Sequence, residues 1–595
     1  MPSSFEPKFA TLLDIYRASV RRFADRPLFG TKAGGAWTWL TYRQFAEQTD
    51  ELRAGLASIG LERGDRVGII ANNRPEWAIG AYATYGLGAA FVPMYESQLP
   101  KEWAYILRDC AAKVVLVAND EIRATIEGLR GEIPTLEHVV LIAGDGSDLT
   151  FEELRRRGRS TPVDLADVAR DEVAGLIYTS GTTGNPKGVK LSHANLANNV
   201  SAMHEVFPMD AEDRSLSFLP WAHSFGQTAE LHMLFSMGAS LGIAESVSTI
   251  LENLAEVKPT LLFSVPRIFN RIYDGVMRKI EEGGGLRKQL FMSALQVAEE
   301  RRALAEQHKR SGLVDLKHGV LDRLVFRTVR GRFGGRLKYA FSGGAAISKE
   351  VAEFIDSLGI TVYEGYGLTE TSPIATANWP GARKIGSVGQ AIPGVRIEID
   401  HDITEDPKNG EVIIHGHNVM LGYHNLDEEN AKVFTKDGGF RSGDMGYLDE
   451  DGFLYITGRI KEQYKLENGK YVVPAPLEEQ LQISPFITTA FINGQNKPYN
   501  VALIVPDMPT VRAWATERGL NGSDEELLDR PEVRGLYQAE LDRQSSGFKG
   551  YERVKAFGFL QEDFTVENGL LTPKLSVKRR KVMERFGDRL EHLYR

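Results

Sequence analysis

The chain has 595 residues, of which 42% are hydrophobic and 25% charged, values typical of a soluble globular protein. Its length predicts more than one domain. The net charge of −9 argues against nucleic acid as the main partner, because binding phosphates along a nucleic acid needs a basic face. The single cysteine, Cys110, excludes an intrachain disulfide framework and indicates a reducing compartment.

The N-terminal segment lacks a basic stretch followed by an apolar core, so no secretory signal is expected. No apolar run approaches the roughly 20 residues of a membrane-spanning helix. We therefore expect a cytoplasmic protein, either free or held peripherally at the inner face of the membrane.

The first half of the chain alternates short apolar runs with helical patterns, which favours parallel α/β sheets. A helix is predicted over 75–87. Strands are predicted at 66–71, 113–117, 138–142, 176–178, 215–219, 261–265, 338–341 and 361–363. Ligands of such sheets bind beyond the carboxyl ends of the strands.

The second half of the chain shows a different pattern of apolar and polar residues. Helical spacing predicts a helical insertion over 271–335, and short alternating strands predict an antiparallel β subdomain at about 395–456. A separate C-terminal block follows Lys461, with strands at 490–492 and 501–505 and helices at 509–518 and 531–544. These patterns divide the chain into domains 1–460 and 461–595.

The segment 178–188 packs hydroxyl side chains, glycines and a lysine into one loop after a buried strand. Backbone amides, hydroxyls and an ammonium group are donors that suit a polyphosphate. The spacing does not match the P-loop of NTPases. A Gly/Thr-rich surface loop without a ligand is the alternative interpretation. The candidate phosphate-binding residues are Thr179, Ser180, Gly181, Thr182, Thr183, Gly184 and Lys187.

This loop resembles the signature of the AMP-forming acyl-adenylate synthetases, and three further motifs follow in that superfamily's order. They are Tyr366-Gly367-Leu368-Thr369-Glu370, Arg441-Ser442-Gly443-Asp444 with Gly458-Arg459, and the segment 571–578. The resemblance runs from about Trp37 to Lys581. The helical segment 271–335, together with Val265-Pro266-Arg267-Ile268-Phe269, resembles the long-chain fatty acyl-CoA synthetase branch, and an ordinary solvated helical insertion is the alternative for that segment.

The resemblance implies an α/β fold. It has a large N-terminal domain of two α/β sheet subdomains with a small β-barrel-like subdomain, and a smaller, mobile α+β C-terminal domain hinged near Lys461. It implies ATP, Mg²⁺ and CoA as cofactor and co-substrates, and a fatty acid as substrate. In the implied reaction, fatty acid and ATP give acyl-AMP and pyrophosphate, and CoA then displaces AMP to form acyl-CoA. The implied enzyme is a monomer or a homodimer.

The resemblance also assigns roles to residues. Glu370 is the expected Mg²⁺ contact and Thr369 an α-phosphate contact, whereas Asp444 is expected at the ribose and Arg459 at the ribose or the phosphates. A surface salt bridge of Glu370 and a turn cap by Asp444 are the alternatives. Tyr366 and the turn Gly343-Gly344-Ala345 are expected at the adenine, and a tight turn without a ligand is the alternative for those three residues. The other expected nucleotide-binding residues are Glu364, Gly365, Gly367 and Leu368.

Lys578 is the expected catalytic lysine of the adenylation step, and Lys574 is a second candidate. Lys578 follows Pro573 by five residues, whereas the common ending of the superfamily has six, and Val577 replaces the usual glycine. A solvated helix face and a membrane-surface patch are the alternatives for the basic run 578–581.

The segment after the strand at 215–219 is expected beside the acyl site. His223 is assigned to orienting the carboxylate, and Trp221, Phe225 and Gly226 to the substrate tunnel. The same stretch nearly matches the Gly-x-Ser-x-Gly nucleophile elbow of hydrolases, with Ala222 in place of the first glycine. A serine hydrolase using Ser224 is therefore an alternative, and it needs one of the later histidines His401, His415, His417 or His424.

Two further alternatives remain. An adenylate-forming ligase for another carboxylic acid would carry the same motifs. A catalytically silent nucleotide-binding module would be expected to lack Glu370 or the lysine, and both residue types are present.

Overall fold

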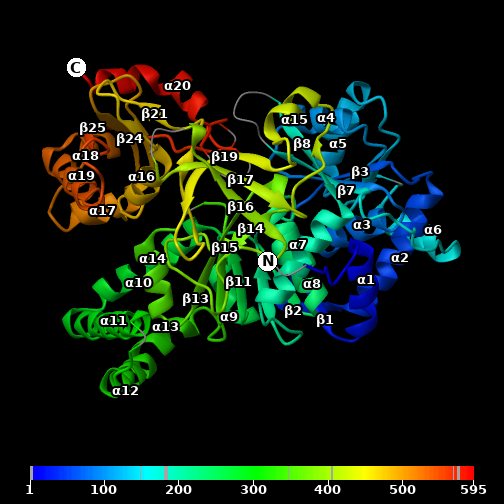
Figure 1. Cartoon of the computed structure of the whole chain (residues 1–595), viewed down its shortest axis with the longest axis horizontal. Helices are drawn as coiled ribbons and strands as arrows, with labels where there is room; N and C mark the ends of the chain where they lie inside the picture. The colour runs from blue at the N-terminus through cyan, green and yellow to red at the C-terminus, as the bar shows by residue number, and fades with distance from the viewer. Residues whose placement is uncertain are drawn as a thin grey trace.

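The computed structural model describes almost the whole chain (Figure 1). The described residues are 5–147, 149–179, 185–307, 309–345, 347–403, 407–566, 568–572 and 577–595. Five of the predicted phosphate-binding residues, Ser180 to Gly184, lie outside them, as does Lys574.

Parallel strands dominate the first of two large sheets. Its strands are hydrogen-bonded in the order β18-β8-β7-β4-β3-β5-β6, and β3 to β7 run parallel while β8 and β18 are antiparallel additions. The prediction missed β4, since Pro93 interrupts its apolar run. The strands are β3 (Arg66–Ile70), β4 (Ala90–Met94), β5 (Val114–Val117), β6 (His138–Leu141), β7 (Val173–Thr179), β8 (Lys187–Ser192) and β18 (Gly422–Tyr423).

The second large sheet has the order β15-β14-β13-β12-β11-β9-β10-β1-β2. Its centre from β1 to β13 is parallel, as predicted for the strands at 215–363. Its strands are β1 (Pro27–Ala33), β2 (Ala36–Thr41), β9 (Arg214–Ser217), β10 (Ser240–Ile243), β11 (Leu261–Ser264), β12 (Tyr339–Ser342), β13 (Thr361–Gly367), β14 (Ile374–Ala377) and β15 (Gln390–Ala391).

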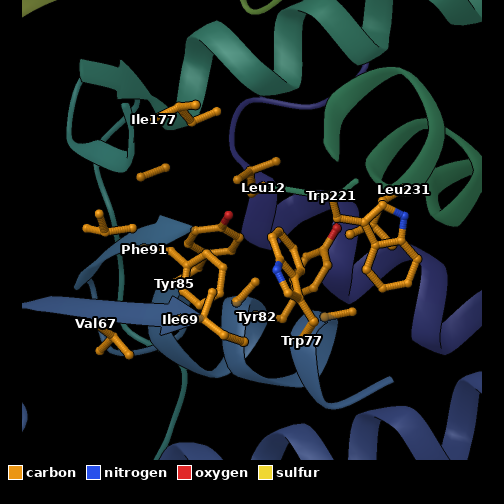
Figure 2. Packing of buried hydrophobic residues seen from close by; sticks show 14 of the residues in the cluster. Leu12, Val67, Ile69, Trp77, Tyr82, Tyr85, Phe91, Ile177, Trp221 and Leu231 are labelled. Carbon is orange, nitrogen blue, oxygen red and sulfur yellow. The ribbon is translucent and has the colours of Figure 1, made fainter. Parts of the chain in front are cut away.

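One hydrophobic core joins the two sheets, and large aromatic side chains fill it. Figure 2 shows Trp77, Tyr82 and Trp221 together in this core. The ring centroids of Trp77 and Trp221 lie 5.7 Å apart, and those of Trp77 and Phe91 lie 5.0 Å apart. The helical elements that supply or flank these residues are α1 (Leu12–Arg22), α3 (Pro75–Tyr85), α7 (His193–Val206), the π-helix η2 (Phe225–His232) and α8 (Met233–Met237).

The predicted antiparallel β region is confirmed as a four-stranded sheet of order β16-β17-β19-β20. It packs around Ala375, Val412, Ile414 and Leu454. Its strands are β16 (Val395–Asp400), β17 (Gly410–Gly416), β19 (Phe440–Leu448) and β20 (Leu454–Arg459).

The C-terminal segment has hydrophobic clusters of its own. It occupies one end of the molecule, coloured orange to red in Figure 1. Its elements are β21 (Tyr464–Lys465), β22 (Tyr471–Val472), α16 (Pro474–Leu481), β23 (Ile487–Asn493), β24 (Asn500–Pro506), α17 (Met508–Thr516), α18 (Asp524–Asp529), α19 (Pro531–Gln544), β25 (Val554–Phe559) and α20 (Arg579–His592).

A helical insertion separates β11 from β12, as predicted, and in Figure 1 its helices α11 and α12 lie at the lower edge of the molecule, away from the sheets. The insertion comprises α10 (Pro266–Glu282), α11 (Gly285–Glu306), α12 (Gly312–Leu321), the π-helix η3 (Asp322–Phe326) and α13 (Arg327–Gly331). Within the described ranges, no helix has both the length and the apolar composition to cross a membrane.

The remaining helical elements cover the sheets or connect strands. They are α2 (Tyr42–Ser58), α4 (Pro100–Asp109), α5 (Asp120–Leu129), η1 (Arg130–Glu132), α6 (Phe151–Ser160), α9 (Ile250–Val257), α14 (Lys349–Ser357), η4 (Thr369–Thr371), η5 (His401–Ile403) and α15 (Asp427–Val433).

Candidate active site

Three distant segments of the chain meet at the Asp444 carboxylate. Asp444 on β19 lies directly opposite Arg459 on β20, and Tyr366 comes from the end of β13. The Tyr366 hydroxyl donates to Asp444 Oδ2 at 2.7 Å, and Arg459 Nε lies 3.1 Å from Asp444 Oδ1. The fold thus brings together three residues that the sequence assigned to one nucleotide.

Asp444 is buried, yet each of its oxygens has a partner. Burial raises the pKa of the Asp444 carboxyl above its usual value, while Arg459 and Tyr366 act in the opposite direction. Its backbone N–H donates to Ser442 Oγ at 3.0 Å, but residues 442–444 lie within strand β19 and the Asp444 carboxylate is engaged by Tyr366 and Arg459, so it does not act as the cap of a turn. The two carboxylate oxygens of Asp444 each contact a different partner and each has a further lone pair. Such a buried carboxylate is suited to accept hydrogen bonds from two neighbouring hydroxyl groups.

A second group of side chains gathers around Tyr423 on β18. The Tyr423 hydroxyl donates to Glu370 Oε1 at 2.8 Å, and Lys187 Nζ lies 5.0 Å from the centroid of the Tyr423 ring. Lys187 also pairs with Glu429, with Nζ 2.6 Å from Oε2. The predicted Mg²⁺ contact and the predicted phosphate lysine therefore share one tyrosine as a neighbour.

Sequence reasoning missed Tyr423. Burial and the nearby Glu370 raise the pKa of its hydroxyl. Tyr423 reaches the site because Gly422 and Tyr423 pair with Lys190 and Val189 of β8, a contact between segments more than 200 residues apart. No local pattern marks such a pairing.

Thr179 and Lys187 face each other across the antiparallel pair of β7 and β8. The intervening residues 180–184 lie outside the described ranges. The predicted phosphate loop thus leaves the carboxyl end of a parallel strand, where ligands of such sheets bind.

Close backbone approaches explain two of the predicted glycines. A Cβ on Gly367 would lie 1.7 Å from the carbonyl oxygen of Pro373, so only glycine fits there. A Cβ on Gly343 would lie 3.2 Å from the Phe225 ring. Phe225 therefore packs against the turn after β12 that also contains Gly344 and Ala345.

The buried Glu364 carboxylate accepts hydrogen bonds from the backbone N–H groups of Gly386 and Ile347. Burial raises the pKa of Glu364 to about 7. Its contacts are with backbone, and they hold the connection between β14 and β15 against β13. Gly365 and Leu368 complete the segment from β13 to η4.

The segment of His223, Ser224 and Phe225 lies beside Thr369. The oxygen of the buried Ser224 hydroxyl is 3.2 Å from Thr369 Oγ1, and His223 Nδ1 accepts the backbone N–H of Phe225 at 3.2 Å. This bond leaves Nε2 of a neutral His223 as the protonated nitrogen. The Ser224–Thr369 contact places this segment beside the 366–370 motif.

The serine hydrolase alternative fails on this geometry. Residues 218–223 separate the end of β9 from Ser224, so the strand-to-helix elbow is missing. Within the described residues no histidine is hydrogen-bonded to Ser224. The later histidines lie elsewhere: His401, His417 and His424 contact the backbone carbonyls of Asn409, Pro393 and Asp109, and His415 lies beside Glu398 and Asp437.

Of the predicted tunnel residues, Trp221 is fully buried in the core shared by the two sheets. Its indole N–H donates to Ser217 Oγ at 3.0 Å. A Cβ on Gly226 would lie 2.4 Å from the carbonyl oxygen of Pro220, so η2 begins tightly packed. A tunnel along Trp221, Phe225 and Gly226 stays a prediction.

Lys578 and Lys461 lie on the C-terminal side of the site. Lys461 follows Arg459 by two residues, and the N–H of the intervening Ile460 donates to Gly443 O at 2.9 Å. Lys578 precedes α20, and its N–H donates to Leu570 O at 2.8 Å. The structure does not bring the Lys578 side chain into contact with Asp444 or Glu370. Of the residues that follow it, Arg579 pairs with Glu478, and Arg580 and Lys581 pair with Glu584.

Comparison with known families decides what this arrangement belongs to. The model of the AMP-binding enzyme family matches residues 16–424, and the model of the AMP-binding enzyme C-terminal domain matches residues 461–595. The chain belongs to the AMP-binding enzyme family. Among curated members, it is 34% identical to the Mycobacterium tuberculosis long-chain-fatty-acid--CoA ligase FadD15, over 96% of this chain and 94% of that one. It is 30% identical to human long-chain-fatty-acid--CoA ligase 1, over 99% and 87% of the two chains.

Comparison with solved structures confirms the α/β fold with a large N-terminal and a smaller C-terminal domain. The anthranilate CoA ligase AuaEII in complex with anthranoyl-AMP superimposes with a TM-score of 0.75 at 21% identity, over 100% of both chains. ATP-bound MatB from Rhodopseudomonas palustris gives a TM-score of 0.71 at 21% identity, over 98% of this chain and 99% of that one.

Proposed function

We propose that this AMP-binding enzyme is a long-chain fatty acid--CoA ligase that forms an acyl-adenylate. A carboxylate oxygen of the acid attacks the α-phosphorus of ATP, and pyrophosphate leaves. The CoA thiolate then attacks the acyl carbon, and AMP leaves with the original carboxylate oxygen. The meeting of Tyr366, Asp444 and Arg459 in a chain of this family carries the proposal, and the curated ligases that match it along nearly its whole length support the substrate class.

The nucleotide is proposed to lie between β13, β19 and β20. Asp444 accepts the two ribose hydroxyls, and Arg459 balances its charge. Tyr366 and the turn of Gly343, Gly344 and Ala345 flank the base, while the phosphates extend toward Thr369, Lys187 and the loop from Thr179 to Gly184. The described residues support this order, because Thr179 ends β7 and Tyr366 lies at the end of β13, both at carboxyl ends of parallel strands.

Glu370 is the proposed Mg²⁺ contact. Its Oε1 accepts the Tyr423 hydroxyl, and Oε2 remains as a ligand atom. In the described residues, no cluster of three or more acidic, histidine or cysteine side chains could hold a metal ion. The donor set nevertheless fits Mg²⁺, which binds one or two carboxylates together with phosphate oxygens and water. Bound there, Mg²⁺ would neutralise charge on the phosphates.

The acyl group is proposed to enter beside His223 and Phe225. The protonated Nε2 of His223 is the donor that would orient the carboxylate, and the apolar Phe225 ring lines the start of the chain. The depth of the site behind Phe225 sets the preferred acyl length.

The C-terminal domain is proposed to turn about Lys461 between the two half-reactions. In the adenylation step, Lys578, with Lys574 as the second candidate, would come to the α-phosphate and stabilise the charge that develops there. A peripheral membrane association and a monomeric or homodimeric state complete the proposal.

Pyrophosphate release with ATP over straight-chain acids of graded length, with and without CoA, tests this function. We expect release that depends on the acid, is greatest for long chains, and yields acyl-CoA only when CoA is present. Release favouring short or aromatic acids would support the alternative, an adenylate-forming ligase for another acid. Release that does not depend on any acid would exclude both.

A further inference from the structure

The outer face of α12 and η3 carries apolar side chains that nothing in the described chain covers. Leu313, Leu316, Val320 and Leu324 have exposed fractions of 63%, 67%, 53% and 63%. Their spacing of three, four and four residues places them along one face of a helix. Soluble proteins rarely leave so many large apolar groups together in water.

The opposite face of the same helix already has its packing partners. Val314, Val325 and Phe326 are buried, and the Phe326 ring meets Phe291 of α11 with centroids 6.1 Å apart. The exposed leucines are therefore a second apolar face and are not needed to hold the helix in place.

Basic side chains flank the exposed face. Lys317, Arg323 and Arg327 are exposed, and within the described residues no acidic group pairs with them. The two acidic residues of the helix are occupied elsewhere, because Asp315 pairs with Arg301 and Asp322 with Arg330. The apolar face is thus bordered by cations that remain available.

The charge of the whole insertion has the same sign. Residues 266–331, from the start of α10 to the end of α13, contain fourteen Lys and Arg and eight Asp and Glu, a net charge of +6 in a chain whose net charge is −9. Of the thirteen exposed large hydrophobic side chains in the described chain, seven lie between Leu286 and Leu324. Apolar exposure and positive charge are therefore concentrated in one segment, at the edge of the molecule (Figure 1).

We propose that the face of Leu313, Leu316, Val320 and Leu324 docks on an anionic lipid surface. A helix in the interface buries its leucines at the boundary of headgroups and acyl chains, while Lys and Arg contact the anionic headgroups. Face-to-face pairing with a second copy would instead set Lys317, Arg323 and Arg327 against their own equivalents. The inference extends the proposed membrane association by naming the surface, and it does not depend on which acid the enzyme activates.

Flotation with lipid vesicles tests the surface. We expect the full-length protein to bind phosphatidylcholine vesicles containing phosphatidylglycerol at least about tenfold more tightly than vesicles of phosphatidylcholine alone. The triple variant Leu316→Ser, Val320→Ser, Leu324→Ser should lose this binding. The triple variant Lys317→Glu, Arg323→Glu, Arg327→Glu should lose the preference for phosphatidylglycerol.

Leu251→Ser is the matched control, because Leu251 is 59% exposed on α9, outside the insertion. It should bind vesicles like the unmodified chain. Thermal unfolding verifies that each variant is folded, and ATP–pyrophosphate exchange with a water-soluble acid measures the chemistry separately from binding.

Vesicle binding by the leucine variant equal to that of the unmodified chain would overturn the proposal, as would failure of the unmodified chain to bind the anionic vesicles. Light scattering without lipid tests the alternative that this face binds a second copy of the chain. If the unmodified chain is a dimer and the leucine variant a monomer, the face is an interface between copies and the lipid proposal is wrong.

Discussion

The Asp444 carboxylate links the fold to the chemistry at the scale of single residues. Asp444→Asn keeps a side chain of the same shape but removes the charge that faces Arg459. We expect adenylation to fall about a hundredfold, measured by ATP–pyrophosphate exchange, with little change in thermal stability. Asp400→Asn is the control, because Asp400 also pairs with an arginine of this small sheet, Arg441 at 2.9 Å. If both variants lost the same amount of ATP–pyrophosphate exchange, the assignment of Asp444 to the nucleotide site would be wrong.

Glu230 gives a prediction about pH and stability. This fully buried residue of η2 accepts the hydroxyls of Ser215 at 2.7 Å and Ser217 at 2.6 Å, and burial raises its pKa from 4.5 to about 7. Because the folded state binds this proton more tightly than the unfolded state, the free energy of unfolding should fall as pH rises from about 4.5 to about 7.

Glu230→Gln removes that titration. Ser217 Oγ already accepts the indole N–H of Trp221 and donates its own proton to residue 230. The amide oxygen of the introduced glutamine must therefore face Ser217, and its NH₂ group faces Ser215. We expect the variant to gain on the order of 3 kcal/mol relative to the unmodified chain between these two pH values, at 1.36 kcal/mol for each pKa unit. Denaturant unfolding at several pH values measures the gap. If the difference in unfolding free energy between the variant and the unmodified chain stayed constant from about pH 4.5 to about pH 7, the raised pKa of Glu230 would be wrong.

The start of η2 is tightly packed against the segment that precedes it. A methyl group on Gly226 would meet the Pro220 carbonyl, whereas one on Gly275 in α10 meets nothing within 4 Å. We expect Gly226→Ala to lower the free energy of unfolding by about 1–3 kcal/mol. Gly275→Ala, the matched control, should raise it by about 0.5–1 kcal/mol because alanine favours a helix. Similar effects of the two substitutions would mean that η2 relaxes away from Pro220.

Much of the element pattern was predictable from the sequence. Apolar runs such as Val114–Val117 and Leu261–Ser264 identify buried parallel strands, and α19 begins and ends where its pattern predicts. The motifs at 366–370, 444 and 459 also predicted residues that the fold brings together. These features could be predicted because each depends on the types of a few adjacent residues.

The unpredicted features depend on distant contacts. Tyr423 reaches Glu370 only because two residues of β18 pair with β8. The extra apolar face of α12 has the same periodicity as a buried helix face, so the sequence alone could not distinguish exposed leucines from core leucines. The near match to a hydrolase elbow at Ser224 failed because the preceding strand ends at Ser217.

At the scale of the whole molecule, the proposal requires the C-terminal domain to take two positions. Lys461→Pro fixes the backbone φ at the proposed hinge, whereas Lys461→Ala removes only the side chain. We expect the proline variant to keep ATP–pyrophosphate exchange but to lose thioester formation from a preformed acyl-adenylate by about a hundredfold. The alanine variant should keep both. Lys578→Ala should show the reverse pattern, with exchange lost and thioester formation retained. Loss of both half-reactions in either Lys461→Pro or Lys578→Ala would contradict the assigned roles.

The fate of the acid's oxygen tests the central claim most directly. A long-chain acid labelled with ¹⁸O in its carboxylate is incubated with ATP, Mg²⁺ and CoA, and the products are analysed by mass spectrometry. Attack on the α-phosphorus predicts one ¹⁸O atom in AMP and none in pyrophosphate for each acyl-CoA formed. Label in inorganic phosphate, with ADP as the nucleotide product, would show attack on the γ-phosphorus and contradict the proposed function.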